Sequence, residues 1–208
     1  MRTTPRIAAA LGAILLVSAS ANAALVSRAG GQAYYDNDLN VTWLANANLA
    51  AGSIYDDGGS TTDGRMTWAS ATAWIASLNT ANYLGISSWQ LPEANASCTG
   101  YFCSSADMYH LFASEGINDA APSPLSNVGG GTYWSDDAFS SAGFAHVFNL
   151  DNVFGGQQSQ FAKNTSTFAW VLAMAPGDAL IPVPAAVWLF GGALGALGMM
   201  RRRAKAAA

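Results

Sequence analysis

The chain has little positive charge outside its two ends. It contains nine lysine and arginine residues in 208, and only Arg28, Arg65 and Lys163 lie away from the termini. All 13 acidic residues lie between Asp36 and Asp178, so the central part carries a net charge of −10. Such an acidic surface argues against nucleic acid and anionic lipid as partners, and it favours cation binding or simple solubility.

Residues that commonly carry catalysis are also scarce. The histidines are His110 and His146, and the glutamates are Glu93 and Glu115. No Gly-x-Ser-x-Gly, His-Glu-x-x-His or phosphate-loop motif occurs, and nothing in the sequence places a glutamate opposite an aspartate, as a glycosidase requires. We therefore predict that the protein is not an enzyme. The alternative is a cell-surface glycan-modifying or hydrolytic enzyme with an unrecognised site.

The N-terminal residues 1–23 have the three parts of a secretory signal peptide. Arg2 and Arg6 supply the positive region, residues 7–17 are apolar, and residues 21–23 read Ala-Asn-Ala, a small-x-small cleavage site. We predict that this segment is a signal peptide and that the protein is exported. An uncleaved N-terminal anchor is the alternative.

Two cysteines, Cys98 and Cys103, lie in the part predicted to be exported. An oxidising compartment favours a disulfide between them, which would close a short loop. The alternative is half of a zinc site, but no second pair of cysteine or histidine residues stands at ligand spacing. We predict the disulfide.

The last segment, residues 181–208, reads as a membrane segment followed by positive charge. An uncharged run over residues 185–200 ends at Arg201, Arg202, Arg203 and Lys205. Sixteen helical residues cover roughly 24 Å, which is short of the roughly 30 Å hydrocarbon core unless residues 181–184 and snorkelling arginines extend the helix. We predict a C-terminal transmembrane helix with its basic tail in the cytoplasm.

The start of this segment resembles a sorting signal. The order of a short Pro-containing motif, a small-residue-rich apolar run and a basic cluster resembles the PEP-CTERM family of bacterial sorting signals. Its VPxPA variant is matched by Ile181, Pro182, Val183, Pro184 and Ala185. Ile181 stands where the variant has valine, and no Pro-Glu-Pro is present. The resemblance implies an exosortase-type membrane protease as partner. It also implies inner-membrane anchoring and then transfer to the cell surface or extracellular matrix. A plain C-terminal membrane anchor is the alternative.

Residues 24–180 have the length of one domain with a sizeable core. Tyr34-Tyr35 and residues 41–44 predict a short hairpin around the turn residues 36–38. Thr67 is a candidate N-cap for a helix of roughly 12 residues, whose apolar stripe contains Trp68, Ala71, Ile75 and Leu78.

A second helix is predicted to begin with Ser104 as its cap, and it buries Met108, Leu111 and Phe112. Strands are then predicted over residues 132–135, 144–150 and 153–161, with a final strand over residues 168–172. The pattern predicts an α+β domain with two helices packed on a small antiparallel sheet.

Several short motifs of this domain occur in a recognisable order. They are Tyr35-Asp36, Leu39-Asn40-Val41-Thr42-Trp43-Leu44, Met66-Thr67-Trp68-Ala69, Trp89-Gln90-Leu91-Pro92, Leu111-Phe112, Tyr133-Trp134-Ser135 and Phe168-Ala169-Trp170-Val171. This order resembles the Lcl C-terminal domain family, a bacterial domain of mostly unknown function that is related to the C-type lectin-like fold. Gln90 and Leu172 stand where that family usually has arginine. The resemblance implies a C-type lectin-like architecture and, by analogy only, adhesion or glycan contact.

Calcium-dependent lectins hold sugars through a calcium ion bound by carboxylate and amide oxygens. Their Glu-Pro-Asn and Trp-Asn-Asp motifs are absent here. Residues 92–95 contain the residue types of the first motif in another order, and residues 134–137 partly resemble the second. The candidate ligand or metal residues are therefore Glu93, Asn95, Asp136 and Asp137. Hard oxygen ligands of this kind suit calcium better than zinc, and the alternative for each residue is a structural role.

These observations predict an exported, surface-sorted, non-catalytic module that contacts extracellular polysaccharide or serves adhesion. No cofactor is required, calcium is the candidate ion, and nucleic acid is not a partner.

If residues 181–208 act as a sorting signal, the mature protein in its native host should lack the end of this segment. Intact mass measurement of the protein isolated from membranes and the cell surface tests this expectation. A main species that retains Trp188 and Arg201 would contradict processing and leave the plain anchor.

Overall fold

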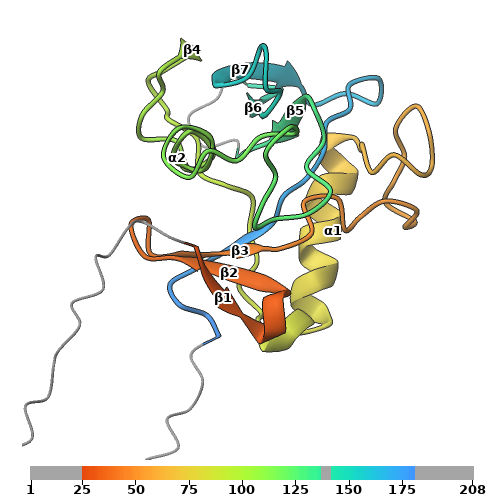
Figure 1. The fold of residues 1–208 in the computed structure, drawn as a ribbon. Helices are drawn as coiled ribbons and strands as arrows, with labels where there is room; N and C mark the ends of the chain where they lie inside the picture. Colours follow the sequence, from red (N-terminus) through yellow and green to blue (C-terminus); the bar gives the residue numbers. More distant parts are fainter. Residues whose placement is uncertain (1–24, 137–141, 181–208) are drawn as a thin grey trace, which may run out of the picture.

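Two antiparallel four-stranded sheets and two α-helices make up the domain (Figure 1). The computed structural model describes residues 25–136 and 142–180. In Figure 1 one sheet lies below the other, and α1 runs alongside both of them. The domain therefore has an α+β fold.

The first sheet has the order β1-β2-β3-β8. Its strands are β1 (Val26–Arg28), β2 (Ala33–Asp36), β3 (Val41–Leu44) and β8 (Met174–Pro176). A short 3-10 turn, η1 (Ala29–Gly31), links β1 to β2. The predicted hairpin is confirmed as the β2–β3 pair, in which Ala33 lies opposite Leu44. Its turn is fixed because one carboxylate oxygen of Asp36 accepts the amides of Asp38 and Leu39, at 3.0 and 3.1 Å.

The second sheet has the order β4-β7-β6-β5. Its strands are β4 (Gly100–Tyr101), β5 (Thr132–Trp134), β6 (Phe144–Asn149) and β7 (Gln157–Ala162). A turn follows the strand predicted over residues 144–150, and β7 begins at Gln157, four residues later than predicted. Asp151 Oδ1 accepts the amides of Val153 and Phe154 in this turn, at 2.8 and 2.7 Å.

Residues 169–176 connect the two sheets. The carbonyl of Trp170 accepts the amide of Trp134 in β5 at 2.9 Å, and the carbonyl of Ala173 accepts the amide of Leu44 in β3 at 3.0 Å. The segment then continues as β8, which pairs with β3. Figure 1 shows this blue part of the chain running from the upper sheet down to β3. Apart from Trp170 and Pro176, its side chains are buried.

Helix α1 (Trp68–Thr80) forms as predicted and buries Ala71, Ile75 and Leu78. Thr67 caps it, because its hydroxyl accepts the amide of Ser70 at 3.3 Å. The carboxylate of Asp57 reinforces the cap by accepting the hydroxyl groups of Thr67 and Ser70. A 3-10 turn, η2 (Tyr83–Gly85), follows.

Helix α2 (Asp107–Ala113) is shorter, and its predicted cap is wrong. The N-cap residue is Ala106, which offers no side-chain hydrogen bond. Asp107 instead accepts the amide of Glu93 at 2.7 Å, so its carboxylate holds a neighbouring segment rather than the helix start. Met108 and Leu111 are buried as the sequence predicts.

The predicted architecture needs correction. The C-type lectin-like arrangement of two helices on one small sheet is wrong, because the described residues form two four-stranded sheets. The predicted final strand over residues 168–172 is also absent as a named strand. In that segment Ala169, Val171 and Leu172 are buried. Only single bridges to Met66 and Tyr133 occur, at Ala169 and Trp170.

The described part of the chain contains no transmembrane helix of the predicted kind. No helix among residues 25–136 and 142–180 is long and apolar enough to cross a bilayer. The segment for which the helix was predicted, residues 185–200, lies outside the described residues.

The ring of Trp170 fixes the junction between the sheets. Its Nε1 donates to the carbonyl of Asp63 at 2.8 Å, and Arg65 lies over the ring at 5.6 Å from its centroid. The ring also covers the backbone of the glycine run before β5. A Cβ added to Gly131 would lie 2.7 Å from Cζ3 of Trp170, so this contact requires glycine.

We therefore expect Gly131→Ala to destabilise the domain by about 1–3 kcal/mol, because the held Trp170 ring has no room to move. Gly59→Ala is the matched control, since its new Cβ would lie 3.8 Å from the nearest atom, in ordinary contact. Urea unfolding of both variants measures the difference. Equal free energies of unfolding for the two variants would contradict the role given to Trp170.

Candidate functional site

Residues 89–95 cross the domain beside both sheets and carry two of the predicted ligand residues. Gln90 and Met174 exchange two backbone hydrogen bonds, at 2.8 and 3.0 Å, which attach the segment to the first sheet. The carbonyl of Pro92 accepts the amide of Asp136 at 2.9 Å, and Asp136 Oδ1 accepts the amide of Ala94 at 3.0 Å. The backbone of the segment is thus fixed between β8 and the end of β5.

A cleft of about 370 Å³ lies between this segment and α1. Helix α1 contributes Trp68 and Thr72, the segment contributes Gln90 and Glu93, and Asp136 lies at the end of β5. Trp68 is partly buried, whereas Glu93 is exposed. The cleft therefore combines an aromatic ring with carboxylate, amide and hydroxyl groups.

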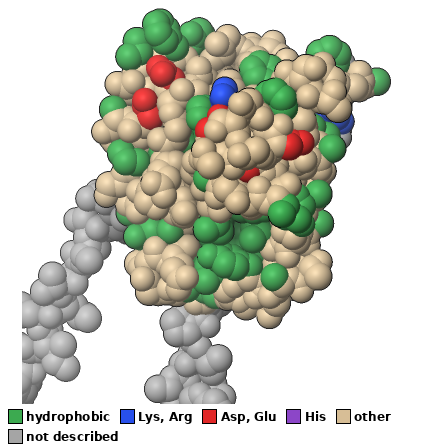
Figure 2. Space-filling view, turned by 90° about the vertical axis from the view of Figure 1, so that its right-hand side faces the viewer, with side chains coloured by type: hydrophobic (Ala, Val, Ile, Leu, Met, Phe, Trp, Pro, Cys, Tyr) green, Lys and Arg blue, Asp and Glu red, His purple; other side chains and the backbone are tan. Residues whose placement is uncertain are grey.

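The ring of Trp68 is held in a defined orientation. It packs edge-on against Trp134, with ring centroids 5.4 Å apart, and Lys163 Nζ lies 5.2 Å from its centroid. Figure 2, which views the domain from the α1 side, shows acidic side chains scattered over a largely uncharged face. A ligand of the cleft thus meets a fixed aromatic ring beside the carboxylates of Glu93 and Asp136.

A second hollow of about 230 Å³ adjoins the cleft. It shares Gln90 and Glu93 with the cleft. It is also lined by Asn40 before β3, by Asp107 at the start of α2, and by residues of β3 and β8. Glu93 consequently stands at the boundary of both hollows.

The structure brings some of the predicted ligand residues together. Glu93 and Asp136 line the same cleft. Asn95 lies further along the segment, and its side-chain oxygen accepts the amide of Ser97 at 3.1 Å. Asp137 lies outside the described residues, as do the predicted sorting motif over residues 181–185 and the basic tail over residues 201–203.

The predicted disulfide between Cys98 and Cys103 is confirmed, with 5.6 Å between the two Cα atoms. Its loop is attached to the second sheet by Gln158 in β7, which is 1% exposed. The side-chain amide of Gln158 donates to the carbonyls of Asn95 and Cys98, at 2.8 and 2.6 Å, and its oxygen accepts the amide of Asn95 at 2.9 Å. No sequence signal identifies Gln158, because it lies in the run of polar residues 157–160.

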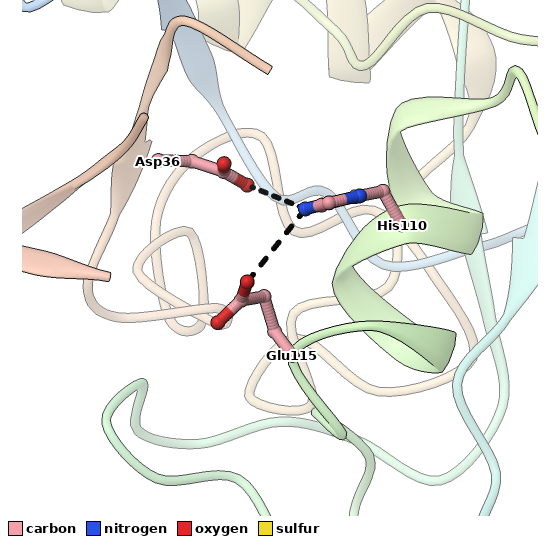
Figure 3. Close-up of side chains that lie close together, drawn as sticks. All are labelled: Asp36, His110 and Glu115. Carbon is pink, nitrogen blue, oxygen red and sulfur yellow. Dashed lines mark ion pairs between the residues drawn. The ribbon is translucent and has the colours of Figure 1, made fainter. Parts of the chain in front are cut away.

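The structure also contains a group of ionisable side chains that the sequence analysis did not predict. Asp36 at the end of β2, His110 in α2 and Glu115 just beyond α2 have ligand atoms within 4.8 Å of one another. Figure 3 shows both carboxylates directed at the same ring nitrogen of His110. Burial raises the pKa of the Glu115 carboxyl, and the charge of Asp36 acts in the same direction. In the sequence these residues look like a turn residue, a helix residue and a helix end.

Comparisons with protein-family models, curated proteins and solved structures found no match to this chain. The resemblances to a PEP-CTERM sorting signal and to the Lcl C-terminal domain family therefore stay predictions.

Asp107 makes the stability of this site depend on pH. Burial raises the pKa of its carboxyl to about 6, the charges of Glu93 and Asp136 act in the same direction, and the amide of Glu93 opposes them. The unfolded carboxyl titrates near 4, so the folded state binds more protons between these values. The contribution of Asp107 to the free energy of unfolding must then fall as pH rises from about 4 to about 6.

We expect Asp107→Asn to flatten this part of the stability profile. The full shift corresponds to at most about 3 kcal/mol, at about 1.4 kcal/mol for each pKa unit. Urea unfolding of the parent and the variant at pH 4, 5, 6 and 7 gives the two profiles. Parallel profiles across this window would contradict the assignment to Asp107.

Proposed function

We propose that this protein is an exported, surface-sorted, non-catalytic module that binds extracellular polysaccharide in the cleft between α1 and residues 89–93. The observation that carries the proposal is the composition of that cleft, in which Trp68 lies beside Glu93, Gln90 and Asp136. Sugars present apolar C–H faces and many hydroxyl groups, so they need an aromatic ring together with polar acceptors and donors.

The negative charge of the domain favours a polysaccharide ligand that itself carries little negative charge. The central part of the chain carries −10, which would repel strongly anionic ligands. The carboxylates of Glu93 and Asp136 can accept hydrogen bonds from sugar hydroxyls, and such charge-assisted bonds are stronger than neutral ones. The preferred ligand is therefore a neutral or weakly charged glycan.

The cleft lacks the side chains of imidazole or thiol catalysis, whereas Glu93 and Asp136 supply two carboxylates, which are the groups that the alternative glycan-hydrolysing function would use. The described lining residues include no histidine or cysteine. His146 is fully buried and faces Gln160 at 3.2 Å, and both cysteines are held in the disulfide. Among the described residues, a nucleophile with an adjacent base is not assembled in the cleft.

The proposed location rests on the sequence. The predicted signal peptide supports export, and the order of the motif at residues 181–185 before the cluster at residues 201–203 supports processing by an exosortase-type membrane protease. Bacteria with such sorting systems make extracellular polysaccharide, which would place the module next to its proposed ligand.

Binding to exopolysaccharide prepared from the producing bacterium tests the proposal. We expect the purified protein to co-sediment with the polymer, and we expect Trp68→Ala to weaken binding about tenfold, since loss of one stacking contact costs about 1.4 kcal/mol. Glu93→Gln, an exposed substitution that spares the core, should also weaken binding. Phe102→Ala is the matched control, because Phe102 is 81% exposed and does not line the cleft.

The outcomes of this experiment separate the two functional hypotheses. Equal binding by the parent, Trp68→Ala and Glu93→Gln would rule out the cleft as the binding site. Release of new reducing ends from the polymer would favour the glycan-modifying enzyme instead. Repeating the assay with a chelator decides whether calcium takes part.

A further inference from the structure

Asp36, His110 and Glu115 come from two separate parts of the chain and meet at one point. Asp36 ends β2, whereas His110 and Glu115 lie in and after α2. Glu115 is brought back toward the histidine because its amide donates to the carbonyl of His110 at 3.2 Å. Within the described residues, this is the group of three histidine, cysteine or acidic side chains spaced closely enough to hold a metal ion.

The distances in this cluster are too long for direct hydrogen bonds. His110 Nε2 lies 3.5 Å from Asp36 Oδ2 and 3.6 Å from Glu115 Oε1 (Figure 3), whereas N–H···O hydrogen bonds span about 2.7–3.2 Å. Two ligands each about 2.1 Å from a tetrahedral zinc ion are about 3.4 Å apart. Both distances from the histidine therefore match the spacing of ligands around one ion.

The cluster is buried but still reachable. The side chains of Asp36, Glu115 and His110 are 1%, 8% and 16% exposed. His110 Nε2 itself is buried and makes no hydrogen bond. A buried nitrogen without a hydrogen bond is costly, and two buried carboxylates repel each other. A divalent cation would remove both costs, and the exposed part of His110 provides its route.

Neighbouring groups hold Asp36 ready for a ligand. Asp36 Oδ1 accepts the amides of Asp38 and Leu39, and Oδ2 lies 3.4 Å from Nε1 of Trp43. Such outer contacts orient a metal ligand before the ion arrives. Glu115, with its longer side chain, can adjust its carboxylate to complete the coordination.

We propose that Asp36, His110 and Glu115 form a binding site for Zn²⁺ or a similar divalent transition metal. An imidazole nitrogen with two carboxylates suits a metal of intermediate softness and disfavours calcium, which prefers oxygen ligands alone. Three protein ligands leave a coordination position for water. The site is separate from the proposed polysaccharide cleft, because none of the three residues lines that cleft.

The alternative is a cluster that binds no metal and in which His110 contacts the two carboxylates directly. Titration of Zn²⁺ into the purified full-length protein, by calorimetry and by metal analysis after dialysis, separates the two. We expect one Zn²⁺ per chain and a rise in melting temperature, because an ion that binds only the folded state stabilises it. Absence of zinc binding by the parent would overturn the proposal in favour of the cluster without metal.

Two variants assign the ligands. His110→Ala and Glu115→Gln should each weaken zinc binding at least tenfold, since even the loss of an outer-shell partner costs 10–100-fold. Glu93→Gln is the matched control, because it makes the same substitution at the other glutamate of the chain, and it should keep the parent affinity. Unchanged affinity in both ligand variants would place the zinc elsewhere and overturn the assignment.

A measurement on the parent protein does not depend on whether the variants fold. Co²⁺ bound to one nitrogen and two carboxylates should give visible absorption that Zn²⁺ abolishes by competition. Excess calcium should leave the absorption unchanged. Displacement of Co²⁺ by calcium, or a spectrum equal to that of Co²⁺ in buffer, would contradict the site.

Discussion

The fold depends on the burial of residues 169–175, which link the second sheet to the first. Ala169, Leu172, Ala173 and Ala175 are fully buried. The backbone of Trp170 bonds to β5, and the carbonyl of Ala173 accepts the amide of Leu44 in β3. The segment therefore bonds to strands of both sheets and joins them. Residues 89–95 and the cleft are attached to the same segment through Met174, which makes the proposed binding site dependent on this one packing arrangement.

Local features of the fold could be predicted because they arise from short-range chemistry. The hairpin at Asp36, the cap at Thr67 and the turn at Asp151 each depend on a side chain bonding to a backbone a few residues away. The two-sheet arrangement could not be predicted in this way. Residues 169–175 are apolar at nearly every position, so no alternation indicates which strands they join.

In the candidate sites too, residues in short motifs could be predicted, whereas residues brought together by tertiary packing could not. Glu93 and Asp136 were recognised from short motifs, and both line the cleft. The cluster of Asp36, His110 and Glu115 was missed because its first member is far from the others in the sequence, and Gln158 was missed because burial of one glutamine in a polar strand leaves no pattern. Both features arise from tertiary packing, which brings remote elements together without a periodic signal.

The salt bridge between Arg28 and Asp178 determines how a pulling force at the end of the domain is distributed over the first sheet. Arg28 Nε donates to Asp178 Oδ1 at 2.8 Å, and Thr42 of β3 bonds to the backbone of Gly177 and Ala179 on the way. The chain after β8 is thereby fastened to β1, the opposite edge of the same sheet. Tension applied beyond residue 180 would be shared by both edges of that sheet instead of peeling β8 away alone.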